Sequence, residues 1–466
     1  MIIVTRSLSA TEFGTWSLIV GLITYVLITH NVISFWVTRE VAREKDSGKT
    51  ALFSSAIFSA IGICAYIIIA NFVSDPTQVE SSLLLFAIIV IPTQFIYTIL
   101  SSINLGWRPQ AVSYGLIILD ITKIPLALIC LNYYDMGVYG VIISVTFGNI
   151  AGSIFLAIFS WKKLCNKLNF KYLKKWFKLS WLPLFPSGIS MISVSDVLIF
   201  SIILGSTEGL GYYSASFYIA SVGTYAAMFA IGSYPKLLAG ESKEYLQNNL
   251  TRFLYFLIPL TLISITFAKP GLYALNPIYE IAYMTVVFLG LRTFFSTIFV
   301  VFSKFLLGDE KVDTSSSSIK SYLHSKLFSI PLLQLIKFSG YIISLIIIFS
   351  LLANNNFIDL ILYWAIINFI IQIPFTLILF YKVKNQFDLK LEFKKILKYI
   401  FSGLISFGFV YLLINNYLEY TPILFDFLPA LVFYVIISIS MYIGITYAID
   451  SSTKIFINSI LQKIKI

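Results

Sequence analysis

Runs of about 20 apolar residues recur along almost the whole chain, and they restrict the folds that are open to it. The sequence of 466 residues is 58% hydrophobic and 12% charged, whereas a soluble domain is about 25% charged. Because an α-helix needs about 20 apolar residues to cross the hydrocarbon core of a bilayer, each run predicts one membrane-spanning helix. The sequence therefore predicts an all-α polytopic membrane protein with about thirteen transmembrane helices. The expected spans lie near 13–37, 51–73, 83–104, 113–131, 137–160, 181–204, 211–235, 252–268, 281–303, 330–353, 358–381, 399–415 and 424–449.

Lysine and arginine residues are distributed unevenly between the loops of this arrangement. The loops after odd-numbered spans hold 28 of them, whereas the loops after even-numbered spans hold one, Lys269. Since basic loops stay on the cytoplasmic side of a membrane, the odd-numbered loops and the C-terminus are expected to be cytoplasmic. Met1 is then expected outside. This pattern is typical of a multi-pass protein of the plasma membrane.

A short sequence pattern occurs twice. Residues 8–17 and 204–214 both contain Thr-Glu, then a glycine, then an aromatic residue and a serine that lead into a span. The separation of about 196 residues predicts two copies of a unit with six spans, and a chance match is the alternative. The first copy follows only seven residues, so one helix is expected to be missing from the front of a protein with fourteen spans. A protein of thirteen spans with an outside N-terminus is the other possibility.

The same residues resemble a known family. Residues 6–16 are similar to the R-x-L-x-x-x-E-[FY]-G motif between the first two helices of polysaccharide-biosynthesis flippases, and residues 196–214 are similar to their seventh-to-eighth helix region. These flippases belong to the multidrug/oligosaccharidyl-lipid/polysaccharide exporter superfamily. The resemblance implies two six-helix lobes around a central cavity, here 1–175 and 176–385, and an extra helix pair with a tail at 386–466.

The resemblance also implies a function. The expected activity is translocation of a polyprenyl-diphosphate-linked oligosaccharide by alternating access, with membrane lipids and other polysaccharide-assembly proteins as further partners. No cofactor, metal ligand set or nucleic-acid partner is expected. Two alternatives remain, a cation-coupled multidrug antiporter of the same superfamily and a membrane glycosyltransferase or polymerase. The short outer loops and the lack of a catalytic motif make an enzyme the weaker interpretation.

Charged residues inside the expected spans are the candidate site residues, because each central charge costs roughly 2.5–3.5 kcal/mol to insert. Asp120 and Lys123 are three positions apart on one helical face and are expected to pair. The pair either packs one lobe or lines the cavity, and Asp120 is a candidate for ion or proton coupling. Asp196 is either a cation or proton site or the partner of Arg292.

Arg292 is the leading candidate for contact with a diphosphate, because a guanidinium matches the geometry of phosphate. A structural ion pair is the alternative. Lys123, Lys337, Arg6 and Arg39 are the further candidates for substrate contact. For Lys337, snorkelling of the amine to the membrane surface is the alternative, and for Arg6 a position at the membrane interface.

Overall fold

The computed structural model describes residues 2–178, 180–231, 243–308, 310, 323–353, 355–388 and 392–464. These residues form helices and no β-strand. Twelve helical segments within them are long and apolar enough to cross a membrane. The predicted all-α polytopic membrane fold is therefore confirmed.

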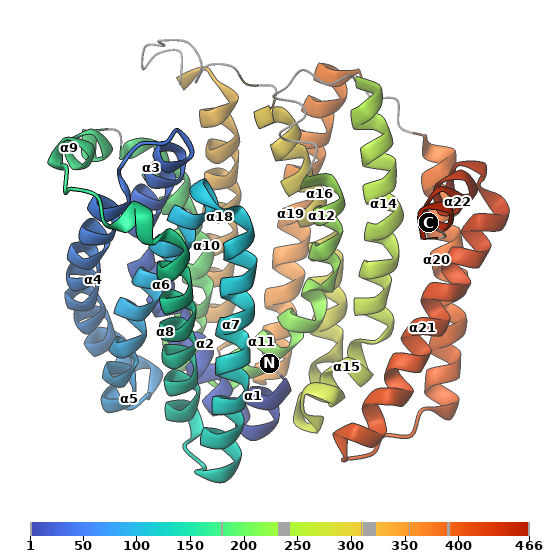
Figure 1. Ribbon diagram of the computed structural model, residues 1–466. Helices are drawn as coiled ribbons and strands as arrows, with labels where there is room; N and C mark the ends of the chain where they lie inside the picture. The colour runs from blue at the N-terminus through green and yellow to red at the C-terminus, as the bar shows by residue number, and fades with distance from the viewer. Residues whose placement is uncertain are drawn as a thin grey trace. The chain divides into compact units, whose positions relative to one another are not determined.

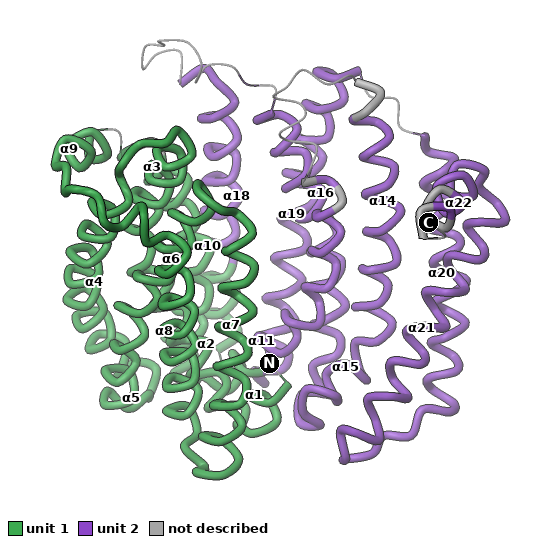
Figure 2. The backbone as a smooth tube through the Cα atoms, viewed as in Figure 1, with its two compact units in different colours: residues 1–211, 345–354 green, residues 212–344, 355–466 purple. Residues whose placement is uncertain are grey.

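The chain divides into two compact units (Figure 2). Unit 1 comprises residues 1–211 and 345–354, and unit 2 comprises residues 212–344 and 355–466. Helix α18 (Lys326–Leu352) contributes its last turns to unit 1 and the remainder to unit 2. The division into 1–175, 176–385 and 386–466 concerns the sequence repeat and stays a prediction.

Unit 1 is built from long helices joined by short connections (Figure 1). Helix α2 begins with a capping box, in which Ser9 and Glu12 satisfy each other's backbone amides. Helix α7 has Pro109 in its first turn, where no backbone donor is required. The helices are α1 (Ile2–Ser7), α2 (Ala10–Leu27), α3 (His30–Ala42), α4 (Gly48–Thr77), α5 (Ser81–Phe86), α6 (Val90–Trp107), α7 (Pro109–Leu128), α8 (Gly137–Leu164), α9 (Phe170–Lys178) and α10 (Trp181–Leu204), with the 3-10 turn η1 (Ala87–Ile89) and the π-helical turn η2 (Ile129–Tyr133).

The first expected span, 13–37, is two helices rather than one. Helix α2 ends at Leu27 and α3 begins at His30. At the break, the amide of Asn31 bonds to the carbonyl of Ile28, and the amide of Val32 bonds to that of Thr29. Because these bonds span three residues rather than four, the helix is interrupted and its axis is free to change direction.

Unit 2 holds the remaining helices. They are α11 (Glu208–Ala220, shared with unit 1), η3 (Ser221–Ala227), α12 (Met228–Ile231), α14 (Lys243–Thr266), α15 (Ala268–Leu275), η4 (Pro277–Ala282), α16 (Tyr283–Gly308), α19 (Phe357–Phe387), α20 (Phe393–Tyr417), α21 (Leu424–Ile449) and α22 (Ser451–Ile464). Two apolar clusters hold it together. One joins α14, α16 and α19 around Phe253 and Phe305, and the other joins α14 to the pair α20 and α21 around Phe407 and Tyr442.

The span expected at 211–235 is also broken. It continues from α11 into the 3-10 segment η3 and then α12, and its last residues lie outside the described part of the chain. Ser221, Gly223 and Thr224 are poor helix formers. A Cβ on Gly223 would lie 3.2 Å from the methyl group of Thr293, so glycine permits the close packing of η3 on α16.

Candidate functional site

Arg292 on α16 is held by an amide. Its Nε donates a hydrogen bond to Oδ1 of Asn368 on α19, 3.2 Å away. Nδ2 of Asn368 donates to the hydroxyl of the buried Tyr341 on α18, at 3.3 Å. Because a guanidinium only donates, the first bond fixes which end of the amide faces Arg292. Three helices of unit 2 therefore orient the Arg292 side chain.

Trp364 supports the same Tyr341 hydroxyl. Its indole Nε1 donates to that oxygen at 2.6 Å. The indole stacks on Tyr213, with ring centroids 3.6 Å apart and planes 6° from parallel. Tyr213 belongs to the second copy of the repeated sequence pattern, so this copy packs directly against the residues that position Arg292.

Lys337 on α18 is buried, with 8% of its surface exposed. Its Nζ donates to Oε1 of Gln372 on α19 at 3.1 Å and lies 4.8 and 4.2 Å from the ring centroids of Phe299 and Phe338. Gln372 in turn donates to Thr376 at 3.0 Å. An amine that snorkels would be exposed, whereas this amine is enclosed by rings and an amide.

The two cations share an electrostatic environment without a compensating acid. Within the described residues, neither Arg292 nor Lys337 forms an ion pair, and their partners are the neutral amides Asn368 and Gln372. The charge of Arg292 also acts on Lys337. Because two like charges in a site of low dielectric are costly, an anion that entered this region would be stabilised.

The local pairing predicted on α7 is formed. Nζ of Lys123 lies 2.6 Å from Oδ1 of Asp120. The side chains retain 35% and 45% of their surface, respectively. Each charge therefore offsets the other on an apolar helix, and both side chains stay partly exposed.

Asp196 lies on α10, two positions after Val194, which lines a small cavity of unit 1. The neighbouring Ser195 accepts a hydrogen bond from the hydroxyl of Tyr25 at 2.9 Å, and the Asp196 carboxylate acts electrostatically on that hydroxyl. The cavity is about 180 Å³ and lies at the break between α2 and α3. Its polar lining comes from Thr24, Tyr25, Asn31, Ser187 and Ser190.

Arg6 and Arg39 are carried by two different helices of unit 1. Arg6 is in the last turn of α1. Arg39 is exposed near the end of α3, with its guanidinium carbon 3.8 Å from the centroid of the Phe35 ring. Arg292 and Lys337 thus act on each other within unit 2, whereas unit 1 holds the other candidates, Asp120, Lys123, Arg6, Arg39 and Asp196. No group of three or more metal-ligating side chains occurs in the described ranges.

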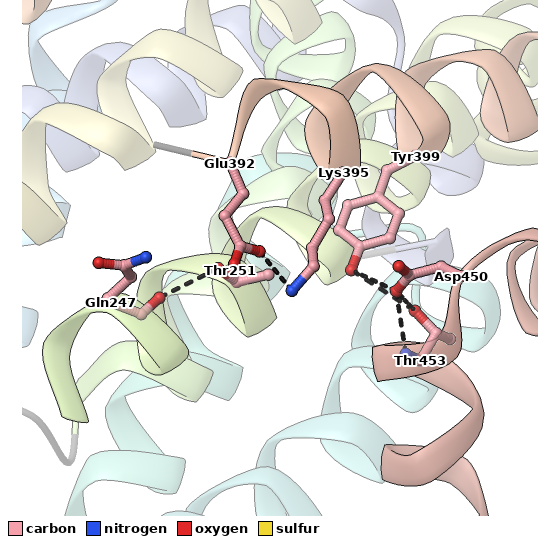
Figure 3. A network of polar contacts seen from close by, with 7 residues as sticks. All are labelled: Gln247, Thr251, Glu392, Lys395, Tyr399, Asp450 and Thr453. Atoms are coloured by element: carbon pink, nitrogen blue, oxygen red, sulfur yellow. Dashed lines mark hydrogen bonds and ion pairs between the residues drawn. The ribbon is translucent and has the colours of Figure 1, made fainter. Parts of the chain in front are cut away.

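A second polar cluster joins α20, α21 and α22 (Figure 3). The buried Asp450 accepts hydrogen bonds from the hydroxyl of Tyr399 at 3.2 Å and from the backbone and hydroxyl of Thr453 at 2.9 and 2.8 Å. Burial acts to raise the pKa of Asp450, but the bonds from Thr453 and Tyr399 lower it overall. Glu392 and Lys395 form an ion pair on α20. This cluster caps α22 and fixes it to the helix pair.

Two neutral amides inside the spans belong to the site and were not among the predicted site residues. Asn368 and Gln372 are the partners of the two cations, four positions apart on α19. A buried amide without a partner is also costly. An Asn and a Gln four positions apart lie on one face of a helix, so their presence inside an apolar span could have predicted polar partners on a neighbouring helix. The sequence does not single out Tyr341 and Trp364, because aromatic residues are common throughout it.

The folded chain belongs to a recognisable structural class. No protein-family profile and no curated protein sequence matches it. Its fold is that of multi-pass membrane transporters. It is similar to the lipid II flippase MurJ in an inward closed conformation, with a TM-score of 0.66 and 18% identity over 96% of this chain and 95% of that one.

Multidrug transporters have a related fold. An inward-facing multidrug resistance MATE family transporter of the MOP superfamily gives a TM-score of 0.59 at 14% identity, over 82% of this chain and 93% of that one. An outward-facing structure of such a transporter gives 0.52 at 15% identity, over 82% of this chain and 96% of that one. The twelve apolar helices and these neighbours indicate a multi-pass membrane protein.

Proposed function

We propose that this protein is a flippase that moves a lipid-diphosphate-linked oligosaccharide across the plasma membrane by alternating access. The observation that carries the proposal is the pair Arg292 and Lys337, two cations inside membrane helices that are held by neutral amides. A diphosphate supplies the negative charge that this arrangement lacks. The similarity in fold to a lipid II flippase also supports this proposal.

The geometry of Arg292 suits a phosphate group. Asn368 occupies its Nε, and within the described residues the two terminal nitrogens have no hydrogen-bond partner. These nitrogens present parallel donors that match two phosphate oxygens. Arg292 therefore binds the diphosphate and Lys337 adds charge. Lys123, Arg6 and Arg39 remain further candidates for substrate contact, and Asp196 and Asp120 for coupling to an ion or proton.

A cationic drug is a poorer ligand for this region. The positive charges of Arg292 and Lys337 repel a cation, and no acid among the described residues neutralises them. A multidrug antiporter of cationic compounds would place a carboxylate there. The oligosaccharide flippase is therefore the function we propose.

Purified protein in liposomes tests the proposal directly. A polyprenyl-diphosphate oligosaccharide with a fluorescent label on the sugar is incorporated, and quenching by an impermeant reductant reports the label that reaches the outer leaflet. We expect flipping by the wild type, and a rate at least tenfold lower in Arg292→Gln and Lys337→Gln. Lys382→Gln, at an exposed position of unit 2, is the matched control.

Three outcomes are decisive. Flipping at the wild-type rate by both variants would remove these cations from the site. Transport of a cationic dye without flipping of the lipid would favour the antiporter. If Arg292→Lys flips at the wild-type rate while Arg292→Gln does not, charge is required and guanidinium geometry is not.

A further inference from the structure

Helix α9 connects the end of α8 to the start of α10 and has two exposed faces of different chemistry. Residues 162–178 contain seven lysines and no acidic residue. Since successive residues of a helix are about 100° apart, Lys171, Lys174 and Lys178 lie within one narrow arc. Phe170 and Phe177 form the adjoining flank. We call these five residues the α9 surface.

The opposite face of α9 is fixed to unit 1. Trp176 is 1% exposed and packs in an apolar cluster with residues of α3, α4, α6, α7 and α8. Its Nε1 donates to Oε2 of the buried Glu40 at 3.1 Å. Oε1 of Glu40 lies 3.2 Å from Nζ of Lys175. Glu40 therefore anchors the helix and neutralises one lysine, while the three lysines of the α9 surface point away from this contact.

The two phenylalanines of the α9 surface stay largely exposed although α9 packs against unit 1. The ring of Phe170 lies against Phe53 of α4, and that of Phe177 lies against Phe58. Even so, 64% of Phe170 and 53% of Phe177 stay exposed. Exposed tryptophans stand on either side of α9, Trp161 at 64% and Trp181 at 40%. Aromatic rings of this kind, at the ends of membrane spans, are typical of the boundary between headgroups and acyl chains.

We propose that the α9 surface binds the headgroups of anionic membrane lipids, with its lysines on the phosphates and its phenylalanines at the acyl boundary. Basic residues near a membrane attract anionic lipids, and an amphipathic helix lies in the plane of the interface with its aromatic side facing the acyl chains. An acidic protein would be attracted by the lysines alone. The exposed phenylalanines beside them favour a lipid surface. This inference does not depend on the transported substrate.

Cys165 provides a reporter five residues before α9. It is exposed, so a donor fluorophore attached there in a Cys64→Ala/Cys130→Ala background reports lipids near the helix. The protein is placed in phosphatidylcholine vesicles that contain an acceptor on either phosphatidylglycerol or phosphatidylcholine at equal mole fraction. We expect stronger energy transfer to phosphatidylglycerol. The preference should fall at least fivefold in Lys171→Gln/Lys174→Gln/Lys178→Gln, and also in 0.5 M salt.

The matched control is Lys382→Gln/Lys384→Gln/Lys394→Gln, which removes the same charge from exposed positions of unit 2. This control variant should keep the preference for phosphatidylglycerol that the donor on Cys165 reports. Equal transfer to both lipids in the wild type, or an unchanged preference in the α9 variant, would overturn the proposal. Elution as a single species in detergent establishes that each variant is folded.

Discussion

The Oγ1 of Thr207 donates a hydrogen bond to the backbone carbonyl of Thr11, 3.1 Å away. These threonines occupy the same position in the two copies of the repeated Thr-Glu pattern, 196 residues apart. Thr15 lies 3.0 Å from the same Thr207 hydroxyl. The two copies of the pattern therefore lie against each other within unit 1, at the starts of α2 and α11.

Glycine at position 14 is expected to be required for this contact. A Cβ on Gly14 would lie 1.8 Å from the carbonyl oxygen of Thr207, and one on Gly211 would lie 2.1 Å from that of Ala10. Because backbone atoms cannot move aside cheaply, Gly14→Ala should destabilise the fold by at least about 1–3 kcal/mol. Thermal unfolding in detergent measures the effect. Gly188→Ala, where no atom lies within 4 Å of the added carbon, is the control, and equal unfolding temperatures for the two variants would contradict the packing argument.

Placing an acid beside the cations should abolish the proposed anion binding. Asn368→Asp puts a carboxylate at the atom that now accepts from Arg292, so the guanidinium becomes paired. We expect the flipping rate to fall at least tenfold while the protein remains folded. Asn356→Asp changes an amide at the N-cap of α19, where a carboxylate also caps well, and should flip normally. Full activity of Asn368→Asp would show that the neutral amide is not needed.

Removing one hydroxyl should destabilise the Arg292 network. Tyr341→Phe leaves Nε1 of Trp364 and Nδ2 of Asn368 without their acceptor. A buried unsatisfied group costs about 1–3 kcal/mol, so the unfolding temperature should fall. Tyr363→Phe, with a side chain 38% exposed, tests an equivalent change outside the network. A loss of stability in Tyr363→Phe as large as in Tyr341→Phe would mean that the network contributes nothing specific.

Acid should weaken the attachment of α22. The pKa of Asp450 is lower in the folded protein than its ordinary value of about 3.9, because Thr453 and Tyr399 donate hydrogen bonds to the carboxylate. Its stabilisation is thus complete above about pH 4 and is lost as the pH falls through the depressed folded value. Asp450→Ala should cost about 1–2 kcal/mol at pH 7 and progressively less as the pH is lowered through that range. Unfolding of both proteins between pH 7 and 3 measures this, and a difference that does not change with pH would exclude the carboxylate as the cause.

Local spacing made one contact among the candidate residues predictable. Asp120 and Lys123 are neighbours on one turn of a helix, so their ion pair follows from the sequence as soon as a helix is expected. The membrane spans follow equally directly, since about 20 apolar residues are needed to cross a bilayer. The breaks at 28–29 and at η3 did not follow, because hydropathy reports apolar content and not the pattern of backbone bonds.

The sequence by itself determined that this chain is an all-α membrane protein with charged residues inside a few of its apolar helices. Only the tertiary structure decided that Arg292 meets Asn368, 76 residues away, that Lys337 meets Gln372, and that Trp176 of α9 docks on Glu40. The physical reason is that lipid, and not water, surrounds these helices. A helix in lipid is apolar on every side, so its hydrophobic pattern does not show which face packs on another helix. Contacts between distant residues then depend on how side chains of several helices fit together.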